Sequence, residues 1–189
     1  LGLLPPVPPL ILWNRGDAAF DVEQDTALAQ ALSGVPRGAG MDRAGPLADL
    51  ALWQSQGRIS GADAFAARMA LRQGRPVLPT PGPARPGLRL ALAGAPLGGD
   101  GLHRWLDPQG VLALDLQGPD APLGDPADLL AAHSIDALIW QVDPHDDLHG
   151  WHAPALRRLC DTLGIRFVDL GFVPSWPTPA DLPKALPCD

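Results

Sequence analysis

Short apolar runs alternate with amphipathic segments throughout the second half of the chain. The unbroken hydrophobic character of these runs is typical of buried parallel strands. The predicted strands are residues 88–93, 111–116, 137–142 and 167–170. The predicted helices are residues 100–106, 126–133 and 151–163. Strand and helix alternate at the length of a βαβ crossover, which predicts an α/β fold with a doubly wound parallel sheet in flavodoxin- or Rossmann-like layers.

The first part of the chain has a different pattern. Its predicted elements are a strand at residues 10–13 and helices at residues 18–32 and 47–54. Ser60 and Asp63 have the spacing of a capping box, which predicts a further helix that runs to about Gln73. We therefore expect residues 1–75 to form the first strand and an N-terminal helical lobe.

A proline-rich segment separates the two patterns. Residues 76–87 contain five prolines and two glycines, and such a composition is incompatible with a regular helix or a central strand. The segment predicts a stiff linker between the helical lobe and a parallel α/β domain at residues 88–189.

Charge and composition exclude several classes of partner. The net charge is −7, and residues 88–189 carry fourteen aspartates against six basic residues. An acidic surface repels phosphate, so we expect neither nucleic acid nor an anionic membrane surface as a partner. No apolar run approaches the roughly 20 residues that cross a bilayer. Two isolated cysteines, Cys160 and Cys188, form no disulfide framework, and we expect a cytoplasmic protein.

The loop after the strand at 137–142 concentrates acids and histidines. His145, His149 and His152 are spaced by four and three residues, so one helical turn could direct all three imidazoles the same way. Together with Asp143 or Asp147 they could ligate a divalent metal such as zinc or ferrous iron. The alternative is a solvated turn whose aspartates cap the helix that follows.

The turn after the strand at 88–93 is rich in glycine. Gly94, Gly98, Gly99 and Gly101 could let backbone amides approach a phosphate or a cofactor tail at a helix N-terminus. The spacing matches neither the dinucleotide-binding fingerprint nor the nucleotide P-loop. The alternative is a plain connection between a strand and a helix.

Several segments resemble the last domain of 2-hydroxyacyl-CoA dehydratase and benzoyl-CoA reductase subunits. They are residues 90–98 (LALAGAPLG), 102–106 (LHRWL), 110–115 (GVLALD), 135–145 (IDALIWQVDPH) and 163–170 (LGIRFVDL). The resemblance implies a parallel α/β fold and an acyl-CoA ligand. It also implies a partner, either a related subunit of the family or a second copy of this chain.

Catalytic members of that family hold an iron–sulfur cluster on cysteines. The position that matches the family's cysteine before Asp-Pro is Val142, and a hydrocarbon side chain cannot ligate iron. The resemblance therefore implies a subunit without its own cluster, which acts as a partner or pseudoenzyme. The alternatives are a metal-dependent enzyme or binding protein that uses residues 143–152, and a binder of a CoA-type ligand at residues 94–101.

Overall fold

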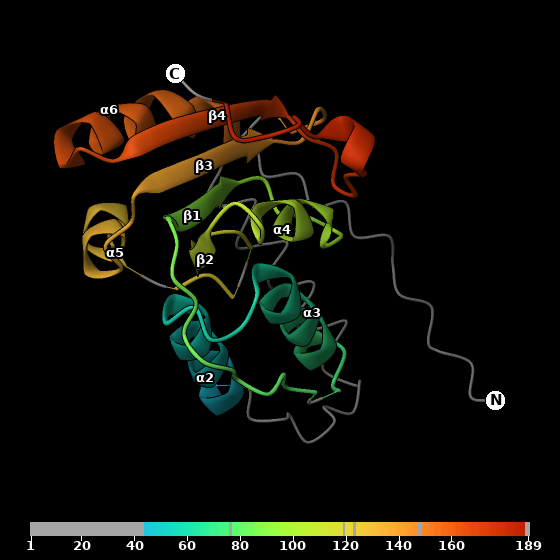
Figure 1. The fold of residues 1–189 in the computed structure, drawn as a ribbon. Helices are drawn as coiled ribbons and strands as arrows, with labels where there is room; N and C mark the ends of the chain where they lie inside the picture. Colours follow the sequence, from blue (N-terminus) through green and yellow to red (C-terminus); the bar gives the residue numbers. More distant parts are fainter. Residues whose placement is uncertain (1–43, 76, 119, 123, 147–148, 188–189) are drawn as a thin grey trace, which may run out of the picture. The chain divides into compact units, whose positions relative to one another are not determined.

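A four-stranded, fully parallel sheet forms the centre of the described part of the chain (Figure 1). The computed structural model describes residues 44–75, 77–118, 120–122, 124–146 and 149–187. The strands are β1 (Arg89–Gly94), β2 (Val111–Asp115), β3 (Ala137–Val142) and β4 (Arg166–Phe172), in the spatial order β2-β1-β3-β4. The predicted α/β fold is confirmed, while the predicted strand at 10–13 and helix at 18–32 lie outside the described residues.

Helices lie on both faces of this sheet. They are α2 (Ala44–Ser55), α3 (Gly61–Arg72), α4 (Gly101–Leu106), α5 (Pro126–Ala132) and α6 (Ala153–Leu163), with 3₁₀ turns η1 (His149–His152) and η2 (Pro179–Asp181). The helix predicted at 151–163 thus begins as a 3₁₀ turn. Within the described ranges, every helix falls short of the length and apolar character that crossing a membrane requires.

Each face of the sheet has its own hydrophobic core. Every residue of β2 and β3 is buried, as expected for parallel strands that are covered on both faces. On one face, Leu138 and Trp140 of β3 pack with Leu130 of α5 and Cys160 of α6. The other core contains Leu90 and Leu92 of β1, Leu112 of β2, Ile139 of β3, and Leu102 and Leu106 of α4. The alternation of strand and helix therefore produces two layers of helices around one sheet.

Helices α2 and α3 pack beside β2 and α4. Leu50 of α2 and Leu71 of α3 are fully buried there. The predicted cap of α3 is confirmed, because the Ser60 hydroxyl accepts a hydrogen bond from the Asp63 amide at 3.0 Å. A carboxylate distant in sequence adds a second cap, since Asp107 accepts from the Gly61 amide at 2.7 Å.

The segment between α3 and β1 contains no helix or strand among its described residues. Its backbone is nevertheless held against the turn after α2, where Gly82 donates to the Arg58 carbonyl at 2.8 Å and Arg85 donates to the Gly57 carbonyl at 3.1 Å. Residues 42–189 form one unit, so α2, α3 and the sheet belong together.

The strand order creates a switch point between β1 and β3. The connection from β1 leads to β2 on one side, and the chain then crosses back to β3 on the other side. In open α/β sheets, ligands bind where the carboxyl ends of the strands separate at such a point. Gly94 ends β1 there and has a φ of +117°.

Gly94→Ala tests how closely β1 and β3 must approach at this edge. An added Cβ would lie 1.7 Å from the Gln141 carbonyl oxygen, in a backbone region that favours glycine. We expect a loss of about 3 kcal/mol or more in the free energy of unfolding, measured by urea denaturation. The control is Gly45→Ala in α2, where a Cβ meets nothing within 4 Å. An equal effect of both substitutions would contradict the tight approach.

Candidate functional site

A groove opens at the switch point, between the sheet and helices α5 and α6. We call it the switch-point groove, and its volume of about 680 Å³ is within the range of small-molecule sites. The sheet contributes Ala93 and Trp140, and α6 contributes Leu156 and Leu159. The polar residues at the groove are Asp125, His149 and His152. A mostly apolar lining with a few polar groups is typical of a ligand site.

Asp143 fixes the loop that follows β3. One carboxylate oxygen accepts from the Ser175 hydroxyl at 2.6 Å, and the other accepts from the His145 amide at 2.9 Å. The hydrogen bond from Ser175, followed by the bond from the His145 amide, lowers the pKa of Asp143. Asp143 therefore ties the loop to the segment after β4.

Asp146 and His149 form a close pair further along this loop. The Asp146 carboxylate lies 2.5 Å from His149 Nδ1 and also accepts from the His149 amide at 3.1 Å. His149 and His152 are three residues apart in η1, and such positions eclipse in a 3₁₀ turn. Both imidazoles line the switch-point groove.

The structure does not bring the predicted metal ligands together at one place. His149 and His152 share the groove, whereas His145 is exposed and Asp143 engages Ser175. Among the residues that the structure describes, no group of three or more His, Cys, Asp and Glu could hold a metal ion. Metal binding by the loop, whose Asp147 lies outside the described residues, stays a prediction.

The predicted glycine turn packs against the segment that follows β4. The amides of Gly98 and Gly99 both donate to the Ser175 carbonyl, at 2.8 and 3.2 Å. A Cβ on Gly98 would lie 2.4 Å from the Trp176 ring, and one on Gly101 would lie 2.0 Å from the Pro177 carbonyl oxygen. The glycines thus permit close packing.

Of the four glycines in this turn, Gly94 lines the switch-point groove. Gly98 and Gly99 already direct their amides to a protein carbonyl. Cofactor binding by the whole turn stays a prediction.

The structure places Val142, which the resemblance predicts to stand where a cluster cysteine would be, at the end of a buried strand. Val142 ends β3, is largely buried, and accepts a backbone hydrogen bond from Val173 at 2.9 Å. Cys160 is fully buried in α6, where burial, with a smaller effect of Asp161, raises the pKa of its thiol to about 11. Cys188 lies outside the described residues. A cluster requires thiolates, so the described residues do not fit an iron–sulfur cluster.

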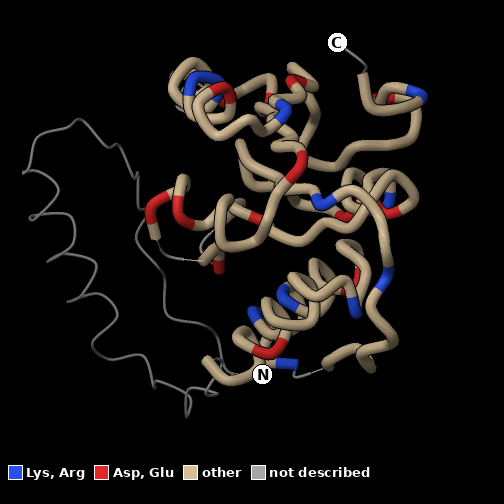
Figure 2. Tube along the Cα trace, turned by 60° about the vertical axis from the view of Figure 1, so that its left-hand side comes forward, with Lys and Arg blue, Asp and Glu red and all other residues tan. Residues whose placement is uncertain are grey.

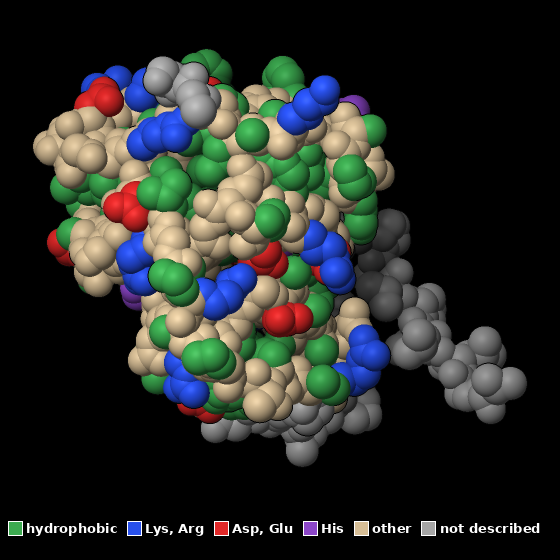
Figure 3. All heavy atoms as spheres, in the orientation of Figure 1, with side chains coloured by type: hydrophobic (Ala, Val, Ile, Leu, Met, Phe, Trp, Pro, Cys, Tyr) green, Lys and Arg blue, Asp and Glu red, His purple; other side chains and the backbone are tan. Residues whose placement is uncertain are grey.

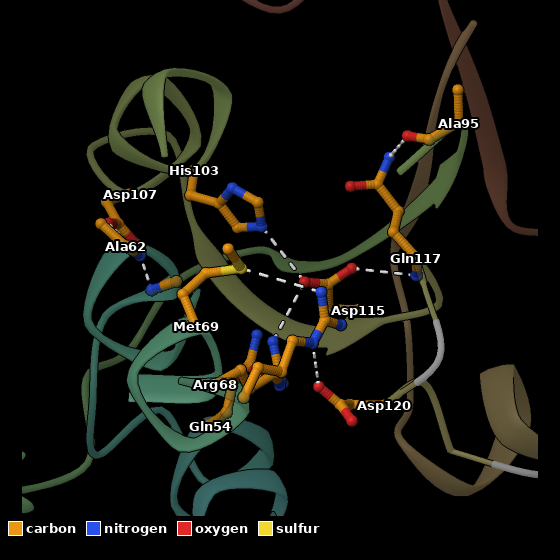
Figure 4. Close-up of polar contacts among 12 residues, drawn as sticks. Gln54, Ala62, Arg68, Met69, Ala95, His103, Asp107, Asp115, Gln117 and Asp120 are labelled. Atoms are coloured by element: carbon orange, nitrogen blue, oxygen red, sulfur yellow. Dashed lines mark hydrogen bonds and ion pairs between the residues drawn. The ribbon is translucent and has the colours of Figure 1, made fainter. Parts of the chain in front are cut away.

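A buried ionic network was not predicted from the sequence (Figure 4). The carboxylate of Asp115, at the end of β2, lies 3.1 Å from both Arg68 Nη1 and His103 Nε2. Its other oxygen accepts from the Gln117 amide at 3.1 Å. The available signals are an aspartate at the end of an apolar strand and a histidine on the apolar side of the preceding helix. Neither signal identifies a partner.

This network continues along the carboxyl edge of the sheet. The Ala95 carbonyl, just after β1, accepts from the Gln117 side-chain amide at 2.8 Å. It also accepts from the Gln141 side-chain amide of β3 at 2.5 Å. Hydrogen bonds therefore connect the ends of β2, β1 and β3.

Opposing effects set the ionisation of Asp115. Burial alone would raise its pKa, but the hydrogen bond and charge of His103, the charge of Arg68 and the Gln117 amide together outweigh burial. The pKa of Asp115 is consequently lowered. The ionised form is the one that the fold stabilises.

Charges of both signs are mixed in the described part of the chain. Arg and Asp side chains lie side by side across the middle of the face in the space-filling view, and residues of both signs occur along the trace (Figures 2 and 3). Arg72, for example, pairs with Asp120 at 2.5 Å.

Comparison with known proteins gives no family assignment. No protein-family model matches the chain, and no curated protein matches it. The observations that bear on function are therefore the parallel α/β fold, the switch-point groove and the side chains around it.

Asp115→Asn tests the buried ionic network. We expect a loss of about 3 kcal/mol in the free energy of unfolding at pH 7, because Arg68 loses its buried charge partner. The pKa of Asp115 is lower in the folded state than in the unfolded state, where it is about 3.9. Ionised Asp115 therefore stabilises the fold above the unfolded-state pKa, and this stabilisation is lost as the pH falls through the folded-state pKa.

The difference in the free energy of unfolding between the wild type and Asp115→Asn should accordingly shrink as the pH falls below about 4. Urea denaturation across this range measures it. The matched control is Asp161→Asn on the exposed side of α6, with an expected change below about 0.5 kcal/mol. A constant difference at all pH values would show that Asp115 charge does not stabilise the fold.

Proposed function

We propose that this chain is a relative of the 2-hydroxyacyl-CoA dehydratase subunits that binds an acyl thioester but carries no iron–sulfur cluster of its own. The observation that carries the proposal is the switch-point groove, which lies at the end of β1 and β3. The dehydratase-like motifs form β1, its turn and β3, so the resembling segments build one side of this groove.

The lining of the groove suits an acyl group. Trp140, Leu156 and Leu159 offer apolar surface, and burying a hydrocarbon chain against it is favourable at about 25 cal/mol per Å². His152 supplies a hydrogen-bond donor for the carbonyl oxygen of the ligand. The proposed orientation therefore places the hydrocarbon against α6 and the thioester beside η1.

The lack of a suitable thiolate at two positions supports a chain without its own iron–sulfur cluster. Val142 replaces a thiol at the end of β3, and Cys160 is held protonated in the core. In this proposal the chain acts as a partner subunit of a related protein or of a second copy. Exposed aromatic side chains at the carboxyl edge of the sheet, Trp151, Phe172 and Trp176, support an interaction of this kind.

Anaerobic purification followed by iron and sulfide analysis tests the absence of a cluster. We expect far less than one iron per chain, because the position that would ligate iron is Val142. Val142→Cys is the informative companion variant, since it restores the thiol of the resembling family. Stoichiometric iron and acid-labile sulfide in the unmodified chain would refute the proposal.

Ala155→Phe tests ligand binding in the groove. Ala155 is exposed on α6 and lines the groove, so a phenyl ring there should occupy ligand space without disturbing the core. We expect the affinity for butyryl-CoA, measured by calorimetry, to fall about tenfold or more, which corresponds to about 1.4 kcal/mol.

The matched control is Ala66→Phe, an exposed position in the middle of α3. It adds the same ring to a helix away from the groove and should leave the affinity unchanged. Failure of the unmodified protein to bind butyryl-CoA would end the proposal for this ligand class.

A further inference from the structure

The pair formed by Asp146 and His149 has the geometry of an acid–base group. We infer that His149, oriented by Asp146, removes and returns a proton on the carbon next to the carbonyl of an acyl ligand held in the switch-point groove. This inference rests on the proposed acyl ligand and adds an activity that needs no iron–sulfur cluster.

The contacts of Asp146 determine which nitrogen of His149 is basic. Asp146 lies 2.5 Å from Nδ1, and an ionised carboxylate only accepts hydrogen bonds. The proton of a neutral imidazole is therefore placed on Nδ1, which leaves Nε2 with a lone pair. Asp146 also accepts from the His149 backbone amide at 3.1 Å, so the same carboxylate fixes both the main chain and the ring.

The surroundings of His149 provide access to a ligand. The side chain of His149 is 37% exposed and lines the groove, whereas the side chain of Asp146 is 18% exposed. An orienting acid that is more buried than the imidazole it holds is the arrangement that positions a general base. His152, on the same side of η1, lies at the groove as a second imidazole.

The chemistry of the lining defines the substrate class. The groove is mostly apolar, which favours a hydrocarbon group, and His152 favours a polar oxygen at one end. A carbonyl compound with a C–H bond beside the carbonyl meets both requirements. Acyl thioesters belong to this class, and their α-hydrogens are acidic enough for removal by a positioned base.

The proton transfer balances without an oxidant or a reductant. The α-C–H bond breaks, the proton passes to His149 Nε2, and the electron pair moves onto the carbonyl oxygen to give an enolate. His152 can donate a hydrogen bond to that oxygen. Return of a proton, or of a deuteron acquired from solvent, regenerates the acyl compound.

Proton NMR of butyryl-CoA in deuterated water measures this activity on the intact chain. We expect loss of the α-hydrogen signal, at a rate proportional to protein concentration, while the thioester remains intact. His149→Gln should slow the exchange about 100-fold or more, the scale of general base catalysis, with affinity for butyryl-CoA largely retained. Asp146→Asn should also slow exchange without weakening binding, because Asp146 positions the base.

The matched control is His145→Gln, in the same loop. His145 is exposed and is not among the residues that line the groove, so this variant should exchange at the wild-type rate. Addition of a chelator should leave the rate unchanged as well. A rate that falls equally in His145→Gln, or that vanishes with chelator, would overturn the assignment of His149.

The result also separates this inference from the proposed function. Binding of butyryl-CoA without α-hydrogen exchange would refute the acid–base role and leave the ligand proposal intact. Absence of binding would refute both.

Discussion

The hydrogen-bond network along the carboxyl edge of the sheet is the constraint on which the rest of the structure depends. It begins at Arg68 in α3, passes through Asp115 and Gln117, and reaches Gln141 through the Ala95 carbonyl. Because the network connects the ends of β2, β1 and β3, it holds together the carboxyl edge of the sheet, where Gly94 lines the groove. Arg68 compensates the buried charge of Asp115, and Gln54 in α2 accepts a further hydrogen bond from the Arg68 guanidinium.

The two sides of the switch point have different chemical characters. On the side of α3 and α4, the ring of His103, which contacts Asp115, lies 4.6 Å from the ring of Phe65, and a smaller cavity of about 240 Å³ is lined by Asp115 and Arg68. Charged groups there are paired with one another, which is the arrangement of a structural network. On the side of α5 and α6, a large and mostly apolar groove remains, and His149, which pairs with Asp146, lines it. A function that involves a ligand is therefore better supported on this second side.

The segment after β4 shows how distant parts of the chain determine a local motif. The glycine turn has the composition of an anion site, yet its amides bind the Ser175 carbonyl. Ser175 also binds Asp143 through its hydroxyl, so one residue holds both candidate loops. The sequence places Ser175 some thirty residues after Asp143, and nothing in its local pattern indicates that it crosses the edge of the sheet.

The sequence by itself determined the elements, because short unbroken apolar runs between turn residues favour buried strands, and because Ser60 caps the start of α3 and Gly164 the end of α6. The predicted strands and helices of residues 88–170 and the cap of α3 could be read in this way. Only the tertiary structure decided which polar groups meet. His149 and His152 reach the groove while His145 does not, since a 3₁₀ turn rather than a continuous helix carries them. Likewise, Asp115 meets Arg68, 47 residues earlier, because α3 packs beside β2, and such long-range pairing leaves no local trace in a sequence.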